Sequence, residues 1–270
     1  MSRMTPSLDE KPGISPANRS LERGVEILRA FRPGSELLGN AELAERTGLS
    51  RSTVSRLTQT LVGVGMLQQE PHLRRYRLAP AVLSLAHAMR SGSTVLHLAA
   101  PMMRALAEQQ KINVGLAAAD RDEMVYLESI RYNRRVSLRN VVSGQRVPME
   151  LTSLGRAYLA AADEARRKTL LSLFKSRRAD WPSLSAEIKR SIEHVGAKGY
   201  CVASWQPEVV ALAAPIVADA SSIFVVNVSV STPEPMSSVA RELAPHLLDL
   251  VARLDKAICA ADANGADAQA

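Results

Sequence analysis

The sequence predicts an α+β protein with a small helical N-terminal domain and a larger C-terminal domain built on an antiparallel sheet. Three observations support this prediction. A glycine separates two short amphipathic segments between residues 40 and 61, a pair of short extended segments follows at residues 66–78, and strand and helix patterns alternate from residue 112 onward. The 270 residues leave room for two domains, and a hydrophobic content of 46% can build two cores.

The N-terminal segment changes character at residue 20. Residues 1–19 mix prolines with polar and charged side chains, which favours a disordered arm, and a DNA-contacting role for this arm stays open. Ser20 is of a residue type that caps helices, and apolar residues recur at helical spacing through residues 21–31. Pro33 and Gly34 then end this first predicted helix.

A second and a third helix are predicted on either side of Gly48. Asn40 is a candidate cap for the second helix, which ends at Gly48 because glycine tolerates the left-handed conformation of a tight turn. Ser50 can cap the third helix. The apolar face of the third helix consists of Val54, Leu57 and Leu61. Two short helices joined by a glycine turn are typical of a helix-turn-helix.

The outward face of the third helix carries hydrogen-bond donors and no acidic residue. Arginine, glutamine, serine and threonine side chains on such a helix can reach base edges and phosphates in the major groove of DNA. The candidate DNA-binding residues of this helix are Arg51, Ser52, Thr53, Ser55, Arg56 and Gln59. The alternative is a solvated basic face on an ordinary helical hairpin.

A hairpin is predicted directly after the third helix, with strands at residues 66–70 and 74–78. Three helices followed by a hairpin predict a winged helix-turn-helix over residues 20–79. Arg74 and Arg75 lie in the wing, where they can contact phosphates or the minor groove. Residues 46–77 contain six arginines and one acidic residue, and the whole chain has a formal net charge of +7, which favours a polyanionic partner.

Three segments carry a resemblance to a known family. They are SLERGVEIL at residues 20–28, AELAERTGLSRSTVSRL at residues 41–57, and RYRL with a following proline at residues 75–80. These segments resemble the DNA-binding domain of the IclR family of bacterial transcriptional regulators. The similarity is nearly unbroken over residues 20–90 and continues more loosely to about residue 257. The family often has Asp or Gly before its Arg-Tyr pair, where this chain has Leu73-Arg74, so we expect a different wing tip on the same fold.

The resemblance implies how the rest of the chain is organised. Residues 80–93 would form a linker helix with dimer contacts near it, although an ordinary domain-packing helix is the alternative. Residues 94–259 would form the GAF-like effector-binding domain of these regulators. Residues 260–270 are expected to be a disordered tail.

Local patterns predict the elements of this second domain. Six strands are predicted, at residues 113–119, 124–130, 135–142, 200–204, 209–217 and 223–231. Five helices are predicted, at residues 95–110, 153–162, 163–174, 183–198 and about 237–258. Because the strands mostly follow one another through hairpins, they predict an antiparallel sheet with the helices on one side.

The loop that enters the helix at residue 153 is a candidate wall of an effector pocket. Thr152 or Ser153 can cap the helix, whose free amides attract anions, while Arg156 adds positive charge and Gly155 allows close approach to the backbone. A plain capped helix with an exposed arginine is the alternative from the residues alone. The resemblance implies that this loop, with Met149, forms one wall of the pocket.

Two further walls are expected on strands. Ser229 and Ser231 point to the same face of one strand, so their hydroxyl groups can bind a carboxylate or hydroxyl group, unless they are solvent-facing serines on an edge. By resemblance, Ala203 and Ala211 form a third wall and replace polar and thiol groups of regulators that bind small keto acids. This difference predicts a less polar or larger pocket that suits an aromatic or longer-chain acid.

Enzymatic and membrane functions find no support in the sequence. The five histidines form no metal-binding pattern, no nucleophile elbow or phosphate-binding loop occurs, and we expect no catalytic residue, metal or cofactor. Cys201 and Cys259 match no metal or redox spacing, and the first nineteen residues do not form a signal peptide. The apolar runs are too short to cross a bilayer, so a soluble cytoplasmic protein is expected.

The combined prediction is a ligand-responsive transcriptional regulator that represses or activates catabolic genes in response to a small organic acid, aromatic acids included. Its expected partners are double-stranded operator DNA, the acid, and further copies of the chain in a homodimer or tetramer. Two alternatives stay open. One is a winged-helix protein-interaction module without specific DNA binding, and the other is a small-molecule enzyme with an accessory DNA-binding domain.

Overall fold

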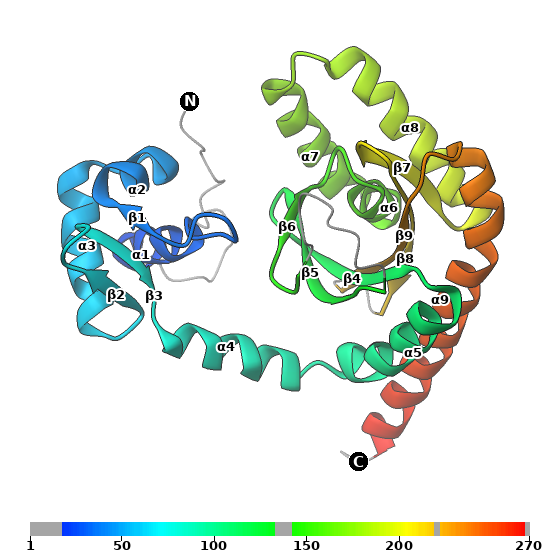
Figure 1. Cartoon of the computed structure of the whole chain (residues 1–270), viewed down its shortest axis with the longest axis horizontal. Helices are drawn as coiled ribbons and strands as arrows, with labels where there is room; N and C mark the ends of the chain where they lie inside the picture. The colour runs from blue at the N-terminus through cyan, green and yellow to red at the C-terminus, as the bar shows by residue number, and fades with distance from the viewer. Residues whose placement is uncertain (1–17, 133–141, 219–221, 268–270) are drawn as a thin grey trace. The chain divides into compact units, whose positions relative to one another are not determined.

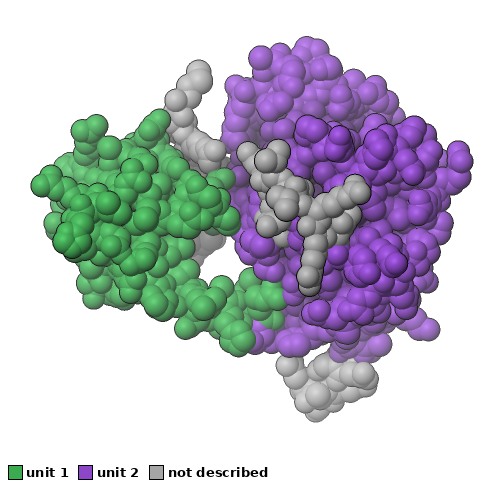
Figure 2. Space-filling view, viewed as in Figure 1, with its two compact units in different colours: residues 1–90 green, residues 91–270 purple. Residues whose placement is uncertain are grey.

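The computed structural model describes residues 18–132, 142–218 and 222–267. The chain divides into two compact units, residues 1–90 and 91–270, which are green and purple in Figure 2. The division falls at the end of the predicted linker helix. Residues 1–17 of the predicted arm lie outside the described part of the chain, and Arg19 already belongs to the first helix.

The first unit is a winged helix with one strand more than predicted. Its helices are α1 (Arg19–Arg29), α2 (Asn40–Thr47), α3 (Arg51–Gly63) and α4 (Pro80–Ser91), and its strands are β1 (Leu38–Gly39), β2 (Leu67–Glu70) and β3 (Arg75–Leu78). The strands form an antiparallel sheet in the order β1-β3-β2. The core of the unit contains Ile27, Leu38, Leu43, Val54, Leu67 and Tyr76. The helix-turn-helix and its hairpin are therefore confirmed, whereas the two-residue strand β1 is too short to show a sequence period.

Local hydrogen bonds explain where the helices begin and correct two predicted caps. Ser50 caps α3 as predicted, because its hydroxyl group accepts a hydrogen bond from the Thr53 amide at 3.2 Å. Gly48 ends α2 in the left-handed conformation with φ of 70°. The Ser20 cap is wrong, since the Asn18 side chain accepts from the first amides of α1. The Asn40 cap is also wrong, because α2 begins at Asn40 and the Gly39 amide donates to the Glu42 carboxylate at 2.9 Å.

The second unit contains a six-stranded antiparallel sheet in the order β6-β5-β4-β9-β8-β7 (Figure 1). The strands are β4 (Asn113–Asp120), β5 (Glu123–Ile130), β6 (Arg146–Pro148), β7 (Cys201–Gln206), β8 (Val209–Val217) and β9 (Ile223–Ser231). The predicted antiparallel sheet is confirmed. The strand predicted at residues 135–142 falls almost wholly on residues 133–141, outside the described residues, and the short strand β6 was not predicted.

Helices cover both faces of this sheet, so the prediction of helices on one side is wrong. The helices are α5 (Thr94–Gln110), α6 (Ser153–Ala161), α7 (Glu164–Arg177), α8 (Trp181–Lys198) and α9 (Met236–Asp267). Helices α5 and α9 lie on one side of the sheet, and α6, α7 and α8 lie on the other (Figure 1). Their apolar side chains belong to two separate buried clusters, one for each side. The sequence of β8 is apolar without interruption, so the side chains on both of its faces need cover from solvent. Helices on both sides of the sheet provide this cover.

The C-terminal helix is longer than predicted. It extends to Asp267, so the expected disordered tail is wrong for residues 260–267, while residues 268–270 lie outside the described part. Alanine is abundant in this segment and has the highest helix propensity, which offsets the polar composition that suggested a tail. Within the described residues, none of the helices is long and apolar enough to cross a membrane.

One close backbone contact fixes where α6 enters the second unit. Gly155 lies in the first turn of α6, and a β-carbon at this position would collide with the backbone of Met149. Met149 itself is fully buried against the α6 side of the sheet. The contact therefore requires glycine, and it couples the loop before α6 to the helix.

We expect Gly155→Ala to lower the stability of the second unit by about 2–3 kcal/mol, because the added methyl group forces the Met149 backbone to move. This loss corresponds to a decrease of about 5–10 °C in the melting temperature, measured by calorimetry or circular dichroism. Gly196→Ala is the matched control, since open space surrounds Gly196 near the end of α8 and alanine favours the helix there. Equal melting temperatures for the two variants would contradict the prediction.

Candidate nucleic-acid interface and effector site

The candidate DNA-binding face of the first unit lies on α3. Arg56 and Gln59 are exposed on one side of the helix, and Arg51 is exposed in its first turn, whereas Val54 and Thr58 are fully buried. The Thr58 hydroxyl group donates to the Val54 carbonyl at 3.0 Å, so this buried polar group is satisfied inside the helix. The amphipathic division predicted from spacing is therefore present, and its outward side presents cationic and amide donors.

The hydroxyl groups near the start of α3 are already engaged with one another. Ser50 Oγ lies 2.9 Å from Thr53 Oγ1 and 3.1 Å from Ser52 Oγ. Thr53 and Ser55 are half-buried, while Ser52 is exposed. These hydroxyl groups hydrogen-bond one another at the N-terminal cap of α3. A phosphate contact by Ser52 or Thr53 would therefore use a hydroxyl group that already takes part in the cap.

The six arginines of this region separate into two groups. The guanidinium groups of Arg51, Arg56 and Arg74 have no hydrogen-bonded or ionic partner among the described residues. The other three are engaged with the unit itself: Arg46 donates to the Ala30 carbonyl at 3.0 Å, Arg75 pairs with Glu42 at 3.6 Å, and Arg77 pairs with Glu70.

The wing separates its two candidate residues. Arg74 is in the turn before β3 with φ of 49°, and Arg75 is in β3, where Nη1 also donates to the Leu37 carbonyl at 3.4 Å. Seven of the eight predicted DNA-binding residues thus lie on α3 or in the wing turn. Arg75 instead lies in β3 and contacts Leu37 and Glu42.

In the second unit, the loop before α6 is tied down by the residues predicted to bind an effector. Thr152 caps α6, since its hydroxyl group accepts from the Gly155 amide at 3.2 Å and donates to the Pro148 carbonyl at 2.9 Å. Arg156 is only 7% exposed. Its guanidinium group donates to the Glu150 carbonyl at 3.2 Å and to the Glu187 carboxylate at 2.8 Å.

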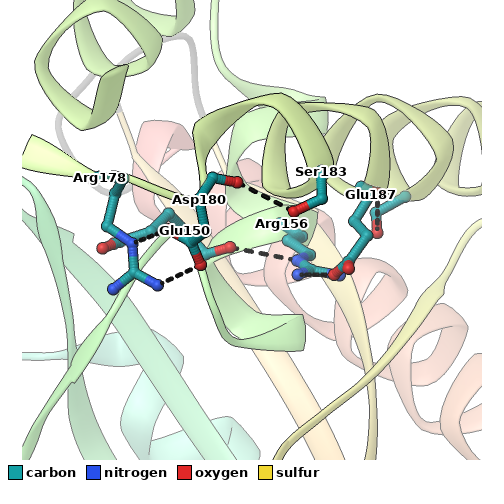
Figure 3. A network of polar contacts seen from close by, with 7 residues as sticks. Glu150, Arg156, Arg178, Asp180, Ser183 and Glu187 are labelled. Atoms are coloured by element: carbon teal, nitrogen blue, oxygen red, sulfur yellow. Dashed lines mark hydrogen bonds and ion pairs between the residues drawn. The ribbon is translucent and has the colours of Figure 1, made fainter. Parts of the chain in front are cut away.

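Figure 3 shows this network, which links the loop at Glu150 to α8 through Arg156 and Glu187. Next to it, Arg178 pairs with Asp180, and this hydrogen-bonded pairing lowers the pKa of the Asp180 carboxyl group. The space above Gly155 is filled by the Met149 backbone, so this glycine serves the fold directly. Any contribution of Arg156 to an anion must compete with its ion pair to Glu187.

The strand residues predicted to line the pocket come together in one row. Ala203 is opposite Ala211, Ala211 is opposite Ser229, and Ser229 is opposite Asn113 on the central strand β4. This row faces α6 and α8, because the alternate residues of these strands, such as Val210 and Val228, pack on the α5 and α9 side. Ser231 is opposite Val209 at the end of the same face.

The two predicted regions meet at Cys201. The buried Cys201 thiol donates to the Ser153 carbonyl at 3.3 Å, which joins the start of α6 to β7 two residues before Ala203. Burial raises the pKa of this thiol to about 12, and the charge of Arg156 opposes the shift. The chain therefore brings the N-terminal end of α6 next to the sheet face that carries Ala203, Ala211 and Ser229.

Sequence reasoning missed three polar residues on this face. Asn227 is opposite Gly115 and its side chain lies near the Tyr126 ring. Burial raises the pKa of Tyr126 to about 12. Asn113 lies diagonally across from Asn227, next to Ser229. An available signal was the position of Asn227, two residues before Ser229 in an otherwise apolar strand.

The described residues contain no group of three or more histidine, cysteine, aspartate or glutamate side chains that could hold a metal ion. The chemistry of the face is that of neutral hydrogen bonding. Hydroxyl, amide and phenol groups lie on a sheet surface with small apolar neighbours, an arrangement that suits a small organic ligand. A winged helix with an outward cationic helix, joined in one chain to such a domain, defines a DNA-binding regulator with a separate ligand-binding domain.

Comparisons with known proteins identify the family. The model of the IclR helix-turn-helix domain matches residues 20–71, and the model of the bacterial transcriptional regulator IclR C-terminal domain matches residues 87–260. The chain therefore belongs to the IclR family of bacterial transcriptional regulators.

Individual relatives agree with this assignment. The HTH-type transcriptional regulator TsaQ1/TsaQ2 of Comamonas testosteroni is 35% identical over 185 residues, which span 68% of this chain and 66% of that protein, just under two thirds of its length. The crystal structure of an IclR family regulator from Brucella abortus has 33% identity and a TM-score of 0.81, covering 92% of this chain and 96% of that one. An IclR homologue from Microbacterium hydrocarbonoxydans, crystallised with 4-hydroxybenzoate, has 22% identity and a TM-score of 0.67 and covers 89% and 99%, so it supports the fold alone.

The two cysteines should differ sharply in reactivity. Cys259 is exposed on α9, whereas Cys201 is buried and has a raised pKa, so its reactive thiolate is scarce at neutral pH. We expect one fast-reacting thiol per chain with Ellman's reagent in the native protein and two after denaturation. Cys259→Ser should abolish the fast reaction. Two fast thiols in the native protein would show that the junction between α6 and β7 opens readily.

Proposed function

We propose that this protein binds operator DNA through α3 and the wing, and represses or activates catabolic genes in response to a small organic acid bound in the second unit. The observation that carries this proposal is the outward face of α3, where Arg51, Arg56 and Gln59 are exposed and the described residues contain no acidic partner for either arginine. Unpaired cations on an exposed helix are suited to phosphates and to the acceptor-rich edges of guanine.

The local contacts of each residue indicate which part of the DNA it can bind. We assign base and phosphate contacts to Arg51, Arg56 and Gln59, with Ser52, Thr53 and Ser55 in supporting phosphate contacts near the start of α3. Arg74 lies in the exposed wing turn and suits the minor groove or a phosphate. Arg75 can contribute only by giving up or sharing its weak, solvent-exposed pairing with Glu42.

The effector is proposed to lie on the α6 side of the sheet, bounded by Met149, Thr152, Ser153, Gly155 and Arg156 and by Ala203, Ala211, Ser229 and Ser231. Two alanines opposite one another leave this face short of side-chain volume and charge, which suits an aromatic or longer-chain acid better than a small keto acid. The homologue from Microbacterium hydrocarbonoxydans is bound to 4-hydroxybenzoate, an aromatic acid, in a similar fold. Calorimetry that found tight binding of pyruvate or glyoxylate would contradict the assignment.

A catalytic role is not part of this proposal, because the relatives are transcriptional regulators. The alternative function, a winged-helix module that binds protein, makes a different prediction about salt. Affinity for DNA should fall steeply as ionic strength rises, since each phosphate contact releases counterions.

Assembly into a homodimer is proposed to involve α4. This helix has no buried residue in the single chain, and Leu83, Leu85 and Met89 are 73%, 59% and 52% exposed. Leu85 and Met89 are four residues apart and share one side of the helix, while Leu83 lies on the other side. Large apolar side chains exposed on a helix in this way are typical of a surface that association covers. Two copies would also present two α3 helices to two half-sites, as winged and other helix-turn-helix dimers do.

We expect Arg56→Ala to weaken binding to a retained genomic DNA fragment by about 10- to 100-fold, which is the effect of removing one base or phosphate contact. A gel-shift titration at fixed salt concentration measures the change. Arg190→Ala is the matched control, because Arg190 is an exposed arginine of α8 and the substitution removes the same charge. If both variants bind DNA like the unmodified protein, the role assigned to Arg56 is wrong.

We expect Leu83→Glu to shift the protein from dimer or tetramer towards a smaller species, because a carboxylate at the most exposed leucine of α4 is costly to bury in an interface. Light scattering or analytical ultracentrifugation over a range of concentrations reports the mass. Leu21→Glu, at an equally exposed leucine of α1, should leave the mass unchanged. An unchanged mass for Leu83→Glu would exclude α4 from the assembly.

A further inference from the structure

We infer that Asn227 and Asn113 form a hydrogen-bond-accepting subsite for the effector, so that the preferred ligand carries a hydroxyl group, or another hydrogen-bond donor, besides its carboxylate. This inference rests on the proposed ligand site and specifies the chemistry that the site selects. It assigns Asn113 of β4 and Asn227 of β9 a part in recognition that neither the family match nor the predicted walls gave them.

The first observation is that both amide oxygens are buried without a donor. Oδ1 of Asn227 and Oδ1 of Asn113 are inaccessible to solvent, and no residue of the described part of the chain hydrogen-bonds either atom. Asn227 as a whole is 5% exposed. A buried carbonyl oxygen that lacks a donor is unfavourable, because it has lost its hydrogen bonds to water. A ligand donor that reaches it recovers this loss.

The second observation is the close arrangement around Asn227. A β-carbon at Gly115 would come within 2.5 Å of both Asn227 Oδ1 and the Tyr126 ring, so only glycine lets the ring and the amide lie this close over β4. Burial raises the pKa of Tyr126 to about 12, so its phenol is neutral at neutral pH. The absence of a side chain at Gly115 thus leaves Asn227 Oδ1 beside the Tyr126 ring, and this oxygen has no donor among the described residues.

The third observation is the position of this subsite beside the other predicted walls. Asn113 is opposite Ser229, which is in turn opposite Ala211, so the two asparagines adjoin the row of small side chains. The N-terminal end of α6 meets the same face through the bond from Cys201 to Ser153. A ligand over this row can direct one polar end to the amides and hydroxyl groups near α6 and the other to Asn227 and Asn113.

Matched acids test the inference on the full-length protein. Two series are used, and the members of each differ in the group they carry besides the carboxylate. Benzoate and propionate carry no second polar group, 4-methoxybenzoate and pyruvate carry a hydrogen-bond acceptor only, and 4-hydroxybenzoate and lactate carry a hydroxyl group that can donate. Isothermal calorimetry and thermal shift give the affinity of each. We expect the hydroxyl member of at least one series to bind about tenfold more tightly than its two partners, the effect of one buried hydrogen bond.

Substitutions locate the effect. Asn227→Leu keeps the branched shape of the side chain and removes the acceptor, so the preference for the hydroxyl acid should fall below about threefold while the acid without a polar group binds at least as well. Asn113→Leu should lower the same ratio, and it serves if the first variant does not fold. Tyr126→Phe is the control, because it removes the phenol but leaves the oxygen of Asn227 in place, and it should retain the preference.

The outcomes separate this inference from the proposed function. Equal binding within each series, or a preference for the acceptor-only acid, overturns the asparagine subsite while the acid-binding site stands. A hydroxyl preference that survives both asparagine substitutions also overturns it. If no acid of either series binds and none alters DNA binding, the inference fails together with the effector site on which it depends.

Discussion

Burial of the central strands from both faces is the constraint on which the second unit depends. Along β8 and β9, side chains alternate between a face under α5 and α9 and a face under α6 and α8, and both faces are apolar over most of their length. Apolar burial of this extent is the main favourable contribution to folding. A polar residue in such a strand is therefore unfavourable unless it has a partner. Asn227 and Asn113 are polar residues on one of these faces, and each has a buried amide oxygen without a partner among the described residues. The proposed ligand subsite is at these two residues.

The parts of the fold that could be predicted are those with a local period. The apolar spacing of α3, the cap at Ser50 and the turn at Gly48 each depend on residues within one or two helical turns, and each is present. The caps at Ser20 and Asn40 failed because a neighbouring group, Asn18 in one case and Glu42 in the other, satisfies the amides better. The prediction of helices on one side of the sheet failed because an apolar run indicates burial without showing which element covers the strand.

The surroundings of a candidate site residue could be predicted where its side chain lies on an exposed surface. The exposure of Arg56 could be predicted because helical spacing places it opposite Val54, and that of Arg51 because it begins the helix. Arg46 and Arg75 belong to the same arginine-rich segment, yet they bind groups distant in sequence, Ala30 and Glu42. The same limit applies to Gly155 and Asn227. Their roles depend on Met149 and on Tyr126, which strand and helix packing brings close to them, and no pattern along the chain records such proximity.

A buried acceptor without a donor also offers a physical basis for regulation. An effector can shift a conformational equilibrium only by as much as its affinity differs between the two conformations. An amide oxygen enclosed by the sheet and α6 is costly by about 1–3 kcal/mol when it lacks a donor. A ligand hydroxyl group that reaches the oxygen only in the enclosed conformation removes this cost there and gains nothing elsewhere. Relief at one oxygen then changes the ratio of conformations by about 5- to 150-fold, a range typical of coupling between an effector site and a second site.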